Sequence, residues 1–315
     1  MEGKLTIFAG SSSPRLTQQI CERLGVEPGK ITLSRFKSGE IYVHYEQSVR
    51  NRDVFLVQSL SHPVNEMFVE LLVMIDAAKR ASARTINIIM PYYGYARQER
   101  KSAPREPISA KMVADVLTTA GANRVVTIDL HAPAIQGFFN IPVDHLTALD
   151  LMTEYLRSKE IYKPVIVSPD AGRASMAEKL ASGLDAPFAM MIKKRPAHNQ
   201  SVITHVIGDV ADHTPIIIED LIDTGSTIVN SVEGLKERGA REAIVCATHG
   251  LFSDNGLQRL RHPSISQVVI TDSIAQPEPH EPYVHVLSVA PMLARATQYI
   301  LDGGSIATLF KDQGI

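Results

Sequence analysis

Short apolar segments rich in isoleucine and valine alternate with helical patterns along the whole chain. Continuous apolar runs of this length are typical of strands covered on both faces, as in a parallel sheet. The alternation therefore predicts α/β architecture with open, mostly parallel sheets. The expected strands include Val54–Val57, Ile86–Met90, Val125–Leu130, Val165–Val167, Ile216–Ile218, Ala243–Ala247 and Val268–Ile270.

Helices are expected where apolar residues return every three or four positions. One such pattern runs from Val64 to Ile75, with Asn65 near its start. A second begins near Ser226 and runs to Gly239, which stands where a helix C-terminal cap belongs.

The number of expected strands is too large for one comfortable sheet, and 315 residues suit two ordinary domains. We place the boundary after the turn-like Asn140-Ile141-Pro142. The prediction is an N-terminal domain of residues 1–145 and a C-terminal domain of residues 146–315, both α/β.

Charge and cysteine content narrow the class of protein. A net charge of -2 argues against a dedicated nucleic-acid binder. The two cysteines, Cys21 and Cys246, do not indicate a disulfide scaffold. The start of the chain has too short an apolar stretch for a signal peptide, and no uncharged apolar run approaches the roughly 18 residues of a spanning helix. We therefore expect a cytoplasmic protein without a membrane or nucleic-acid partner.

The sharpest chemical signal follows the expected strand Ile216–Ile218. Two adjacent acids, Glu219 and Asp220, come next, and a loop of small residues then opens a helix. Such a loop presents backbone N–H groups and hydroxyls at a positive helix end, which suits a phosphate. The acids can accept hydrogen bonds from sugar hydroxyls. An ordinary capping sequence would explain Asp223 and Thr224 but not the two acids.

A second signal is the loop Pro91–Pro107, which follows the strand Ile86–Met90 and precedes a helix near Ile108. Arg97, Arg100, Lys101 and Arg105 concentrate positive charge on it. Such a loop can close over phosphates and screen them from water. A solvated surface loop is the alternative.

Three further segments stand at the ends of expected strands, where open α/β sheets line their active crevices. His131 and Asp170 are candidate metal ligands or hold metal-bound water, although either residue alone is more often structural. Lys193-Lys194-Arg195-Pro196 carries three cations that can neutralise a polyphosphate, or forms a solvated turn.

Together these segments resemble the ribose-phosphate diphosphokinase family, the phosphoribosyl pyrophosphate synthetases, of the bacterial class I type. The resemblance runs from about Ile7 to Phe310. The blocks that carry it are Arg35-Phe36-Lys37-Ser38-Gly39-Glu40, Met67–Ala83, Tyr93–Lys111, Asp129–Phe139, Ser168–Gly172, Lys193–Pro196, Glu219–Thr227 and Gly304–Phe310.

The resemblance implies a fold of two phosphoribosyltransferase-like domains, each a mostly parallel sheet flanked by helices. It implies transfer of the diphosphoryl group of ATP to the 1-hydroxyl of ribose 5-phosphate, giving AMP and phosphoribosyl pyrophosphate for nucleotide biosynthesis. It also implies Mg2+ as cofactor, homohexamers built from dimers, activation by inorganic phosphate and inhibition by ADP.

Residue roles follow from the same resemblance. Phe36 would stack on adenine with Ser38 and Glu40 nearby, and Arg97 and Gln98 would contact ATP. Ribose 5-phosphate would be held by Glu219, Asp220, Asp223, Thr224, Gly225, Ser226 and Thr227.

The remaining roles concern the transfer itself. His131 and Asp170 would be linked to magnesium, and Lys193 and Arg195 would be the catalytic basic pair on a mobile segment.

The chain departs from the family pattern at several positions. Ser38 stands where Asp is usual, and Arg173 replaces a second glycine, where it crowds the pyrophosphate or adds a contact to it. Ile192 replaces an Asp, Ala197-His198 a more basic stretch, and Asn51 a glycine near the regulatory positions Arg50 and Ser305. Two alternatives stay open: a phosphoribosyltransferase that consumes phosphoribosyl pyrophosphate, and a catalytically weak regulatory homologue.

Overall fold

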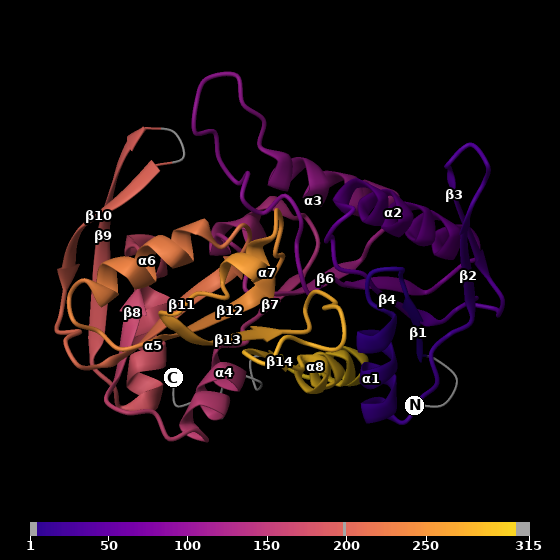
Figure 1. The fold of residues 1–315 in the computed structure, drawn as a ribbon. Coiled ribbons are helices and arrows are strands. Elements are labelled where there is room, and N and C mark those ends of the chain that lie inside the picture. Colours follow the sequence, from indigo (N-terminus) through magenta and orange to yellow (C-terminus); the bar gives the residue numbers. More distant parts are fainter. Residues whose placement is uncertain (1–4, 198–199, 307–315) are drawn as a thin grey trace. The chain divides into compact units, whose positions relative to one another are not determined.

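The computed structural model describes residues 5–197 and 200–306, with side chains for all of these except 193–197 and 200–204. Mostly parallel sheets flanked by helices fill this part of the chain (Figure 1), which confirms the predicted α/β class. None of the helices within the described residues is long and apolar enough to cross a membrane.

The chain divides into two compact units. The first combines Met1–Leu146 with Ser273–Ala275 and Ser288–Ile315, and the second consists of Thr147–Asp272 and Gln276–Leu287. The C-terminal segment thus differs from the expected division, which kept all of residues 146–315 together. The reason lies in packing, because the last helix, Ala290–Asp302, contacts the helix Pro14–Leu24 of the first unit.

The first unit is built on a five-stranded parallel sheet in the order β1-β4-β5-β6-β7. The three central strands are mostly apolar and almost fully buried, as expected for strands covered on both faces. An antiparallel hairpin, β2–β3, forms a separate two-stranded sheet. The strands are β1 (Leu5–Ala9), β2 (Ile31–Arg35), β3 (Ile41–Tyr45), β4 (Asp53–Val57), β5 (Thr85–Ile89), β6 (Arg124–Ile128) and β7 (Val143–Leu146).

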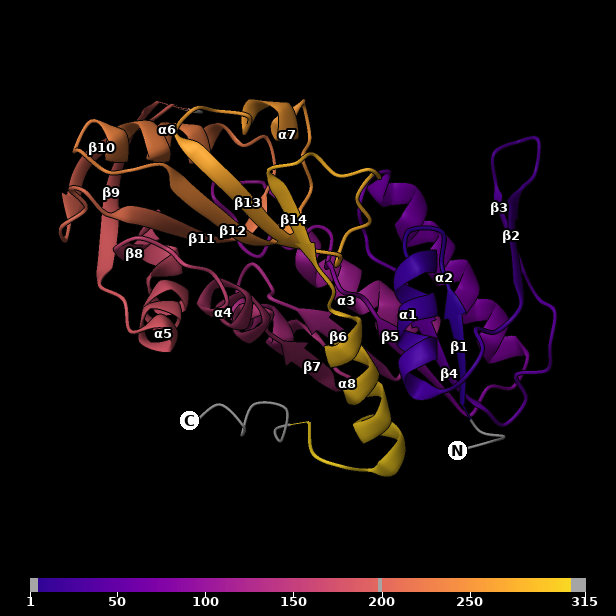
Figure 2. The ribbon, with the colours of Figure 1, turned by 60° about the horizontal axis from the view of Figure 1, so that its bottom comes forward.

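Helices cover both faces of this sheet. Helices α2 and α3 lie on one face, while α1 and α8 pack against each other on the opposite face (Figures 1 and 2). The helices are α1 (Pro14–Leu24), α2 (Val64–Arg80), α3 (Ser109–Ala120), the 3-10 helix η1 (Pro133–Phe138) and α8 (Ala290–Asp302). The predicted helical pattern from Val64 is thus confirmed.

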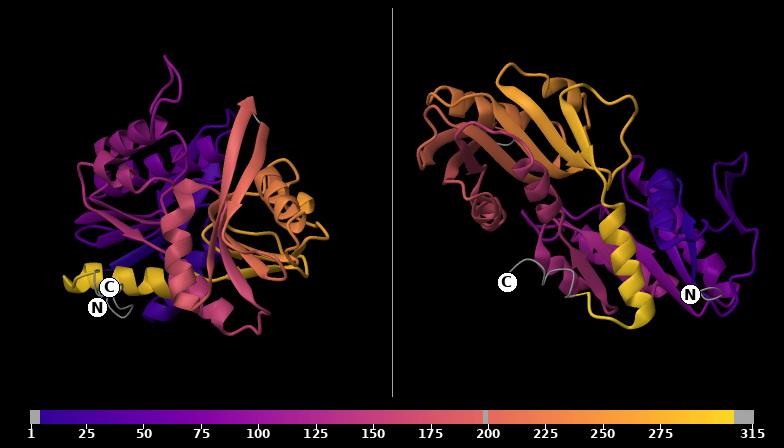
Figure 3. Two further views of the ribbon diagram at one scale, coloured as in Figure 1. Left: turned by 90° about the vertical axis from the view of Figure 1, so that its left-hand side faces the viewer. Right: turned by 90° about the horizontal axis from the view of Figure 1, so that it is seen from below.

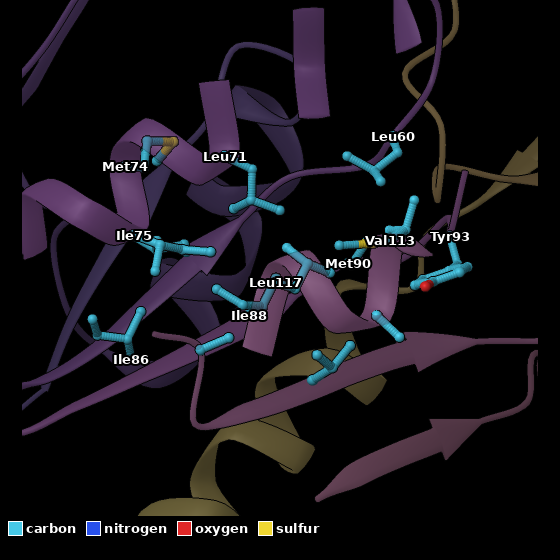
Figure 4. Close-up of a cluster of buried hydrophobic side chains, with 14 of the residues drawn as sticks. Leu60, Leu71, Met74, Ile75, Ile86, Ile88, Met90, Tyr93, Val113 and Leu117 are labelled. Carbon is cyan, nitrogen blue, oxygen red and sulfur yellow. The ribbon is translucent and has the colours of Figure 1, made fainter. Parts of the chain in front are cut away.

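One apolar cluster forms the core between this sheet and α2 and α3 (Figure 4). Leu71, Met74 and Ile75 reach it from α2, and Ile88 reaches it from β5. Their helical and strand periods bring these side chains to one face of each element. Tyr93 belongs to the same cluster and lies near the start of the loop that follows β5. Its hydroxyl donates to the Ala110 carbonyl at 2.8 Å.

The second unit is built on a seven-stranded sheet in the order β10-β9-β8-β11-β12-β13-β14. All neighbours are parallel except the β9–β10 pair, which is antiparallel. The strands are β8 (Pro164–Ser168), β9 (Phe188–Ala197), β10 (Gln200–Ile207), β11 (Thr214–Ile222), β12 (Ala243–Gly250), β13 (Ile265–Thr271) and β14 (Val284–Leu287).

Helices again cover both faces: α4 and α5 lie on one side of the sheet and α6 and α7 on the other (Figure 2). They are α4 (Leu149–Arg157), the 3-10 helix η2 (Ala171–Arg173), α5 (Ala174–Leu184), α6 (Ser226–Lys236) and α7 (Gly256–Arg259). Strands β9 and β10 extend beyond β8, which pairs with β9 only at residues 188–190 (Figure 3).

Candidate active site

The C-terminal end of β11 carries the acid pair. The sequence predicted that Glu219 and Asp220 follow the strand. They lie within it instead, because backbone pairing to β12 continues as far as Ile222. The side chain of Asp220 is only 4% exposed and that of Glu219 only 13% exposed. Two neighbouring carboxylates are thus held in a poorly hydrated place, where they favour partners that carry positive charge or hydrogen-bond donors.

The loop after β11 leads directly into α6, which begins at Ser226 as predicted and ends at Lys236, three residues short of Gly239. Gly225 is the N-cap residue with a φ of 75°, a left-handed conformation that glycine adopts without strain. It has no side chain that could accept a hydrogen bond from the first helical turn. Ser226 and Thr227 are exposed there, at the positive end of the helix, where the first N–H groups have no partner within the helix.

The short helix α7, which the sequence did not predict, packs against this loop. The Arg259 guanidinium in α7 donates to the Thr224 carbonyl. Gly256, at the start of α7, lies under Asp223 and Thr224 at a distance that leaves no room for a side chain. The only local signal for this support is the turn-like Asn255-Gly256 pair.

The loop after β8 carries Asp170. Its Oδ1 accepts a hydrogen bond from the Gly172 N–H at 2.9 Å, and its carbonyl accepts one from the Ser168 hydroxyl at 2.6 Å. Asp170 is therefore the N-cap of η2. Arg173 ends that helix and turns to the acid pair, with Nη2 2.9 Å from Asp220 Oδ1 and Nε 3.5 Å from Glu219 Oε2.

The basic pair Lys193 and Arg195 was expected after a strand end. Instead β9 continues through Ala197, and Lys193 and Lys194 pair with Ile203 and Val202 of β10. Backbone hydrogen bonds to a partner strand extend β9 beyond its apolar run. The side chains of Lys193 and Arg195, and all of His198, lie outside the described part of the structure.

The β2–β3 hairpin carries the residues expected at adenine. Phe36 is 56% exposed and packs edge-on against Tyr42, with ring centroids 5.5 Å apart. The Ser38 hydroxyl donates to Glu40 Oε2 at 2.6 Å, and the Glu40 carbonyl accepts the Phe36 N–H at 2.9 Å. The turn thus presents an exposed aromatic ring, and the hydrogen bond from Ser38 orients the Glu40 carboxylate.

The loop Pro91–Pro107, called the cationic loop below, is buried at its start and exposed beyond it. Tyr92 and Tyr93 are buried, whereas Arg97 and Gln98 are exposed. The Gln98 carbonyl accepts the Ala110 N–H at 3.3 Å, which fixes Gln98 to the first turn of α3. The following segment is held by Glu106, whose carboxylate accepts the N–H groups of residues 102 and 103.

His131 follows β6 in the first unit, whereas Asp170 belongs to the second unit. The sequence analysis missed His145, whose Nε2 accepts the Leu130 N–H at 2.9 Å. Burial lowers the pKa of His145, and the charge of Asp129 opposes this shift. The neutral imidazole, which this hydrogen bond requires, is therefore the favoured form.

Three further observations bear on the chemistry. Among the described side chains, no group of three or more His, Cys, Asp and Glu residues is arranged to hold a metal ion. Burial raises the pKa of Cys246 to about 12, and burial with nearby glutamates raises that of Cys21 to about 12. Both thiols stay protonated at neutral pH, so neither resembles an activated nucleophile.

Asn51 adopts a φ of 56°, a conformation that Asn tolerates in place of glycine.

Two family models match the chain. The N-terminal domain of ribose phosphate pyrophosphokinase matches residues 5–121, and the phosphoribosyl synthetase-associated domain matches residues 165–311.

Curated relatives and a solved structure match nearly the whole chain. A ribose-phosphate pyrophosphokinase of Fusobacterium nucleatum is 50% identical over 307 residues, which cover 96% of this chain and 97% of the relative. One of Bacillus caldolyticus is 48% identical over 98% of both chains. The crystal structure of phosphoribosylpyrophosphate synthetase from Mycobacterium smegmatis is 43% identical, with a TM-score of 0.89 over 96% of this chain and 100% of that chain.

Proposed function

This chain belongs to the ribose-phosphate pyrophosphokinase family, and from that premise we propose that it transfers the diphosphoryl group of ATP to the 1-hydroxyl of ribose 5-phosphate. The products are AMP and 5-phosphoribosyl 1-pyrophosphate, a precursor for nucleotide biosynthesis. The observation that carries the proposal is similarity over almost the full length, which includes the N-terminal part that a simple phosphoribosyltransferase does not need.

We propose that the loop of residues 223–227 binds the 5-phosphate. The first N–H groups of α6 have no partner within the helix, and the exposed hydroxyls of Ser226 and Thr227 add donors. Glu219 and Asp220 then accept hydrogen bonds from the ribose hydroxyls. Asp223, Thr224 and Gly225 shape the turn that brings the phosphate to the helix end.

For ATP, the proposed contacts lie in the first unit. The exposed ring of Phe36 offers a stacking face for adenine, and the Ser38–Glu40 hydrogen bond orients an acceptor beside it. Arg97 and Gln98 are exposed at the anchored end of the cationic loop, which supports contacts with phosphates.

We propose Mg2+ as the cofactor, bound through His131 and Asp170 or through water held by them. The donor set fits, since Mg2+ binds few protein carboxylates and keeps several waters together with substrate phosphates. A dedicated protein cage is not required for such an ion. The ion would neutralise phosphate charge, while Asp170 keeps its loop in place through Gly172.

Lys193 and Arg195 are the proposed catalytic cations. Phosphoryl transfer asks mainly for positioning and for neutralisation of charge on the transferring group. Their positions on β9, which extends beyond the neighbouring strand β8, suit residues that meet a bound polyphosphate.

Assembly and regulation are further parts of the proposal. We propose a homo-oligomer, namely a hexamer, in which the apolar side chains of Val69 and Met112, 47% and 48% exposed in the single chain, are covered by a neighbouring subunit. Phosphate would activate the enzyme through Arg50 and Ser305, and ADP would inhibit it. Its use of ATP and a sugar phosphate favours a cytoplasmic location.

The test is a direct assay. The protein is mixed with ATP, Mg2+ and ribose 5-phosphate, and AMP and phosphoribosyl pyrophosphate are measured together. Equal amounts of both products support the proposal. AMP formation that does not depend on ribose 5-phosphate, or no AMP at all, rejects it, and consumption of phosphoribosyl pyrophosphate with a nucleobase would identify a transferase instead.

A further inference from the structure

Arg173 occupies the acid pair of β11. Its guanidinium lies 2.9 Å from Asp220 and 3.5 Å from Glu219, and its own side chain is only 15% exposed. The contact therefore joins three charged side chains in a place with little water. Ion pairs of this kind are stronger than exposed ones, because the surrounding medium screens them less.

The topology explains why this contact forms. Strands β8 and β11 are parallel neighbours, and Ile217 pairs with Val167 one residue before β8 ends. Because β11 continues to Ile222, the chain that leaves β8 runs alongside the acid pair. The hydrogen bond between Asp170 and Gly172 closes the turn at η2, so the next residue, Arg173, projects from a fixed loop.

The same acids are the proposed acceptors for the ribose hydroxyls. A carboxylate oxygen that faces a guanidinium at ion-pair distance offers less room and fewer lone pairs to a hydroxyl donor. Ribose 5-phosphate must therefore compete with Arg173 for Glu219 and Asp220. A ligand gains only the difference between its own hydrogen bonds and the contacts that it replaces.

We propose that Arg173 is a specificity-determining residue that occupies the acid pair in the free enzyme and is displaced when the ribose hydroxyls bind. This inference rests on the proposed function, because it concerns the sugar site of that reaction. Arg173 lowers the affinity for ribose 5-phosphate and leaves binding of ATP unchanged.

Displacement also affects the choice between sugars. A 2-deoxyribose 5-phosphate has one hydroxyl fewer. It therefore displaces less of the Arg173 contact and also forms fewer hydrogen bonds with the acid pair. Ribose 5-phosphate bears the full cost of displacement. The presence of Arg173 thus narrows the difference in affinity between the two sugars, and its removal widens that difference.

The main experiment compares Arg173→Ala with the unaltered protein. Dissociation constants for ribose 5-phosphate and 2-deoxyribose 5-phosphate are measured by calorimetry, and kcat and both KM values are measured in the AMP assay. We expect Arg173→Ala to bind ribose 5-phosphate about fivefold to tenfold more tightly, which is the net scale of one ordinary hydrogen bond, because the sugar hydroxyls already offset part of the lost ion pair. The preference for ribose over deoxyribose should rise, while kcat and the KM for ATP change about twofold or less.

Two further variants make the outcome decisive. Lys179→Ala removes an equal charge from an exposed position on α5 and should change none of these values. Arg173→Lys keeps the charge but not the two-pronged guanidinium, so it should give intermediate affinities. If circular dichroism shows that Arg173→Ala folds poorly, the affinities of Arg173→Lys still test the inference.

The result that overturns the inference is weaker or unchanged binding of ribose 5-phosphate in Arg173→Ala and Arg173→Lys, with an unchanged preference between sugars. Arg173 would then only position the acids. Failure of the proposed function looks different, because the unaltered protein would form no AMP. The calorimetric comparison between variants still applies in that case.

Discussion

Gly256 lies so close beneath Asp223 that a Cβ atom built on it would stand 2.4 Å from the Asp223 carbonyl oxygen. The same Cβ would be 3.2 Å from the carbonyl carbon of Thr224. Both neighbours are backbone atoms, which cannot rotate away as the end of a side chain can. The loop proposed to bind phosphate is thus held in shape by a glycine some thirty residues further along the chain.

Replacing this glycine should therefore displace the phosphate loop. We expect Gly256→Ala to lower kcat/KM for ribose 5-phosphate by about tenfold to a hundredfold, since small misplacements of binding groups have effects of this size. The KM for ATP should change little, because the proposed ATP contacts lie on other segments. Steady-state kinetics with each substrate varied in turn measure both effects.

A matched control is Gly137→Ala, because Gly137 has open space where a Cβ would be added. It should leave both KM values near those of the unaltered protein. Two results would contradict the assigned role of the loop. One is an equal loss of kcat/KM for ribose 5-phosphate in both variants, and the other is a rise of the ATP KM alone in Gly256→Ala.

The Ser38–Glu40 hydrogen bond yields a second prediction. Ser38→Ala removes the hydroxyl that donates to Glu40 Oε2 at 2.6 Å and so frees the carboxylate to rotate. We expect the KM for ATP to rise about threefold to tenfold, the range of one ordinary hydrogen bond, since this pair is exposed to water. The KM for ribose 5-phosphate should stay the same.

Thr32→Val is the control for this change. Thr32 lies on the same hairpin, and its hydroxyl likewise donates to a glutamate, Glu46, at 2.6 Å. If Thr32→Val raises the ATP KM as much as Ser38→Ala does, the effect belongs to the stability of the hairpin and not to adenine.

Much of this fold follows from periodicity. Each expected strand is present, because a strand buried on both faces needs mostly apolar residues, and such apolar segments are visible in the sequence. Periodicity is less informative where backbone pairing extends a strand into polar sequence. Glu219 in β11 and Lys193 in β9 are examples, since hydrogen bonds to a neighbouring strand hold both residues in extended structure.

Contacts between distant segments could not be predicted in this way. The C-terminal helix α8 packs against α1, although about 270 residues separate the two in sequence. Gly256 and Arg259 stabilise a loop about thirty residues away, and Arg173 reaches acids on another strand. Such contacts depend on the order of strands in the sheet, which local patterns do not fix.

His145 makes stability depend on pH. Burial lowers its pKa, so the unfolded chain takes up a proton on this histidine before the folded protein does. The stabilisation is therefore fully present above the ordinary histidine pKa of about 6.5 and is lost as the pH falls below it. We expect the free energy of unfolding to decrease between pH 7.5 and pH 5.5 more steeply than in His145→Gln.

The Gln variant is suited to this comparison because its side-chain oxygen can accept the Leu130 N–H and does not titrate. Urea unfolding at both pH values gives the difference, and contributions of the other histidines cancel between the two proteins. Parallel pH dependence in the two proteins would mean that His145 does not contribute to it.

The basic pair on β9 gives the last prediction. A cation that meets the charge of the transferring group best in the transition state raises kcat without tightening substrate binding. Removing one such donor typically costs about 2.7–4 kcal/mol, or roughly a hundredfold to a thousandfold in rate. Lys193→Ala should therefore depress kcat strongly and leave both KM values within about threefold. Lys194→Ala, which removes the same charge from the neighbouring position, should keep kcat near normal. Comparable kcat values in these two variants, on protein whose oligomeric state is verified by light scattering, would reject the catalytic role of Lys193.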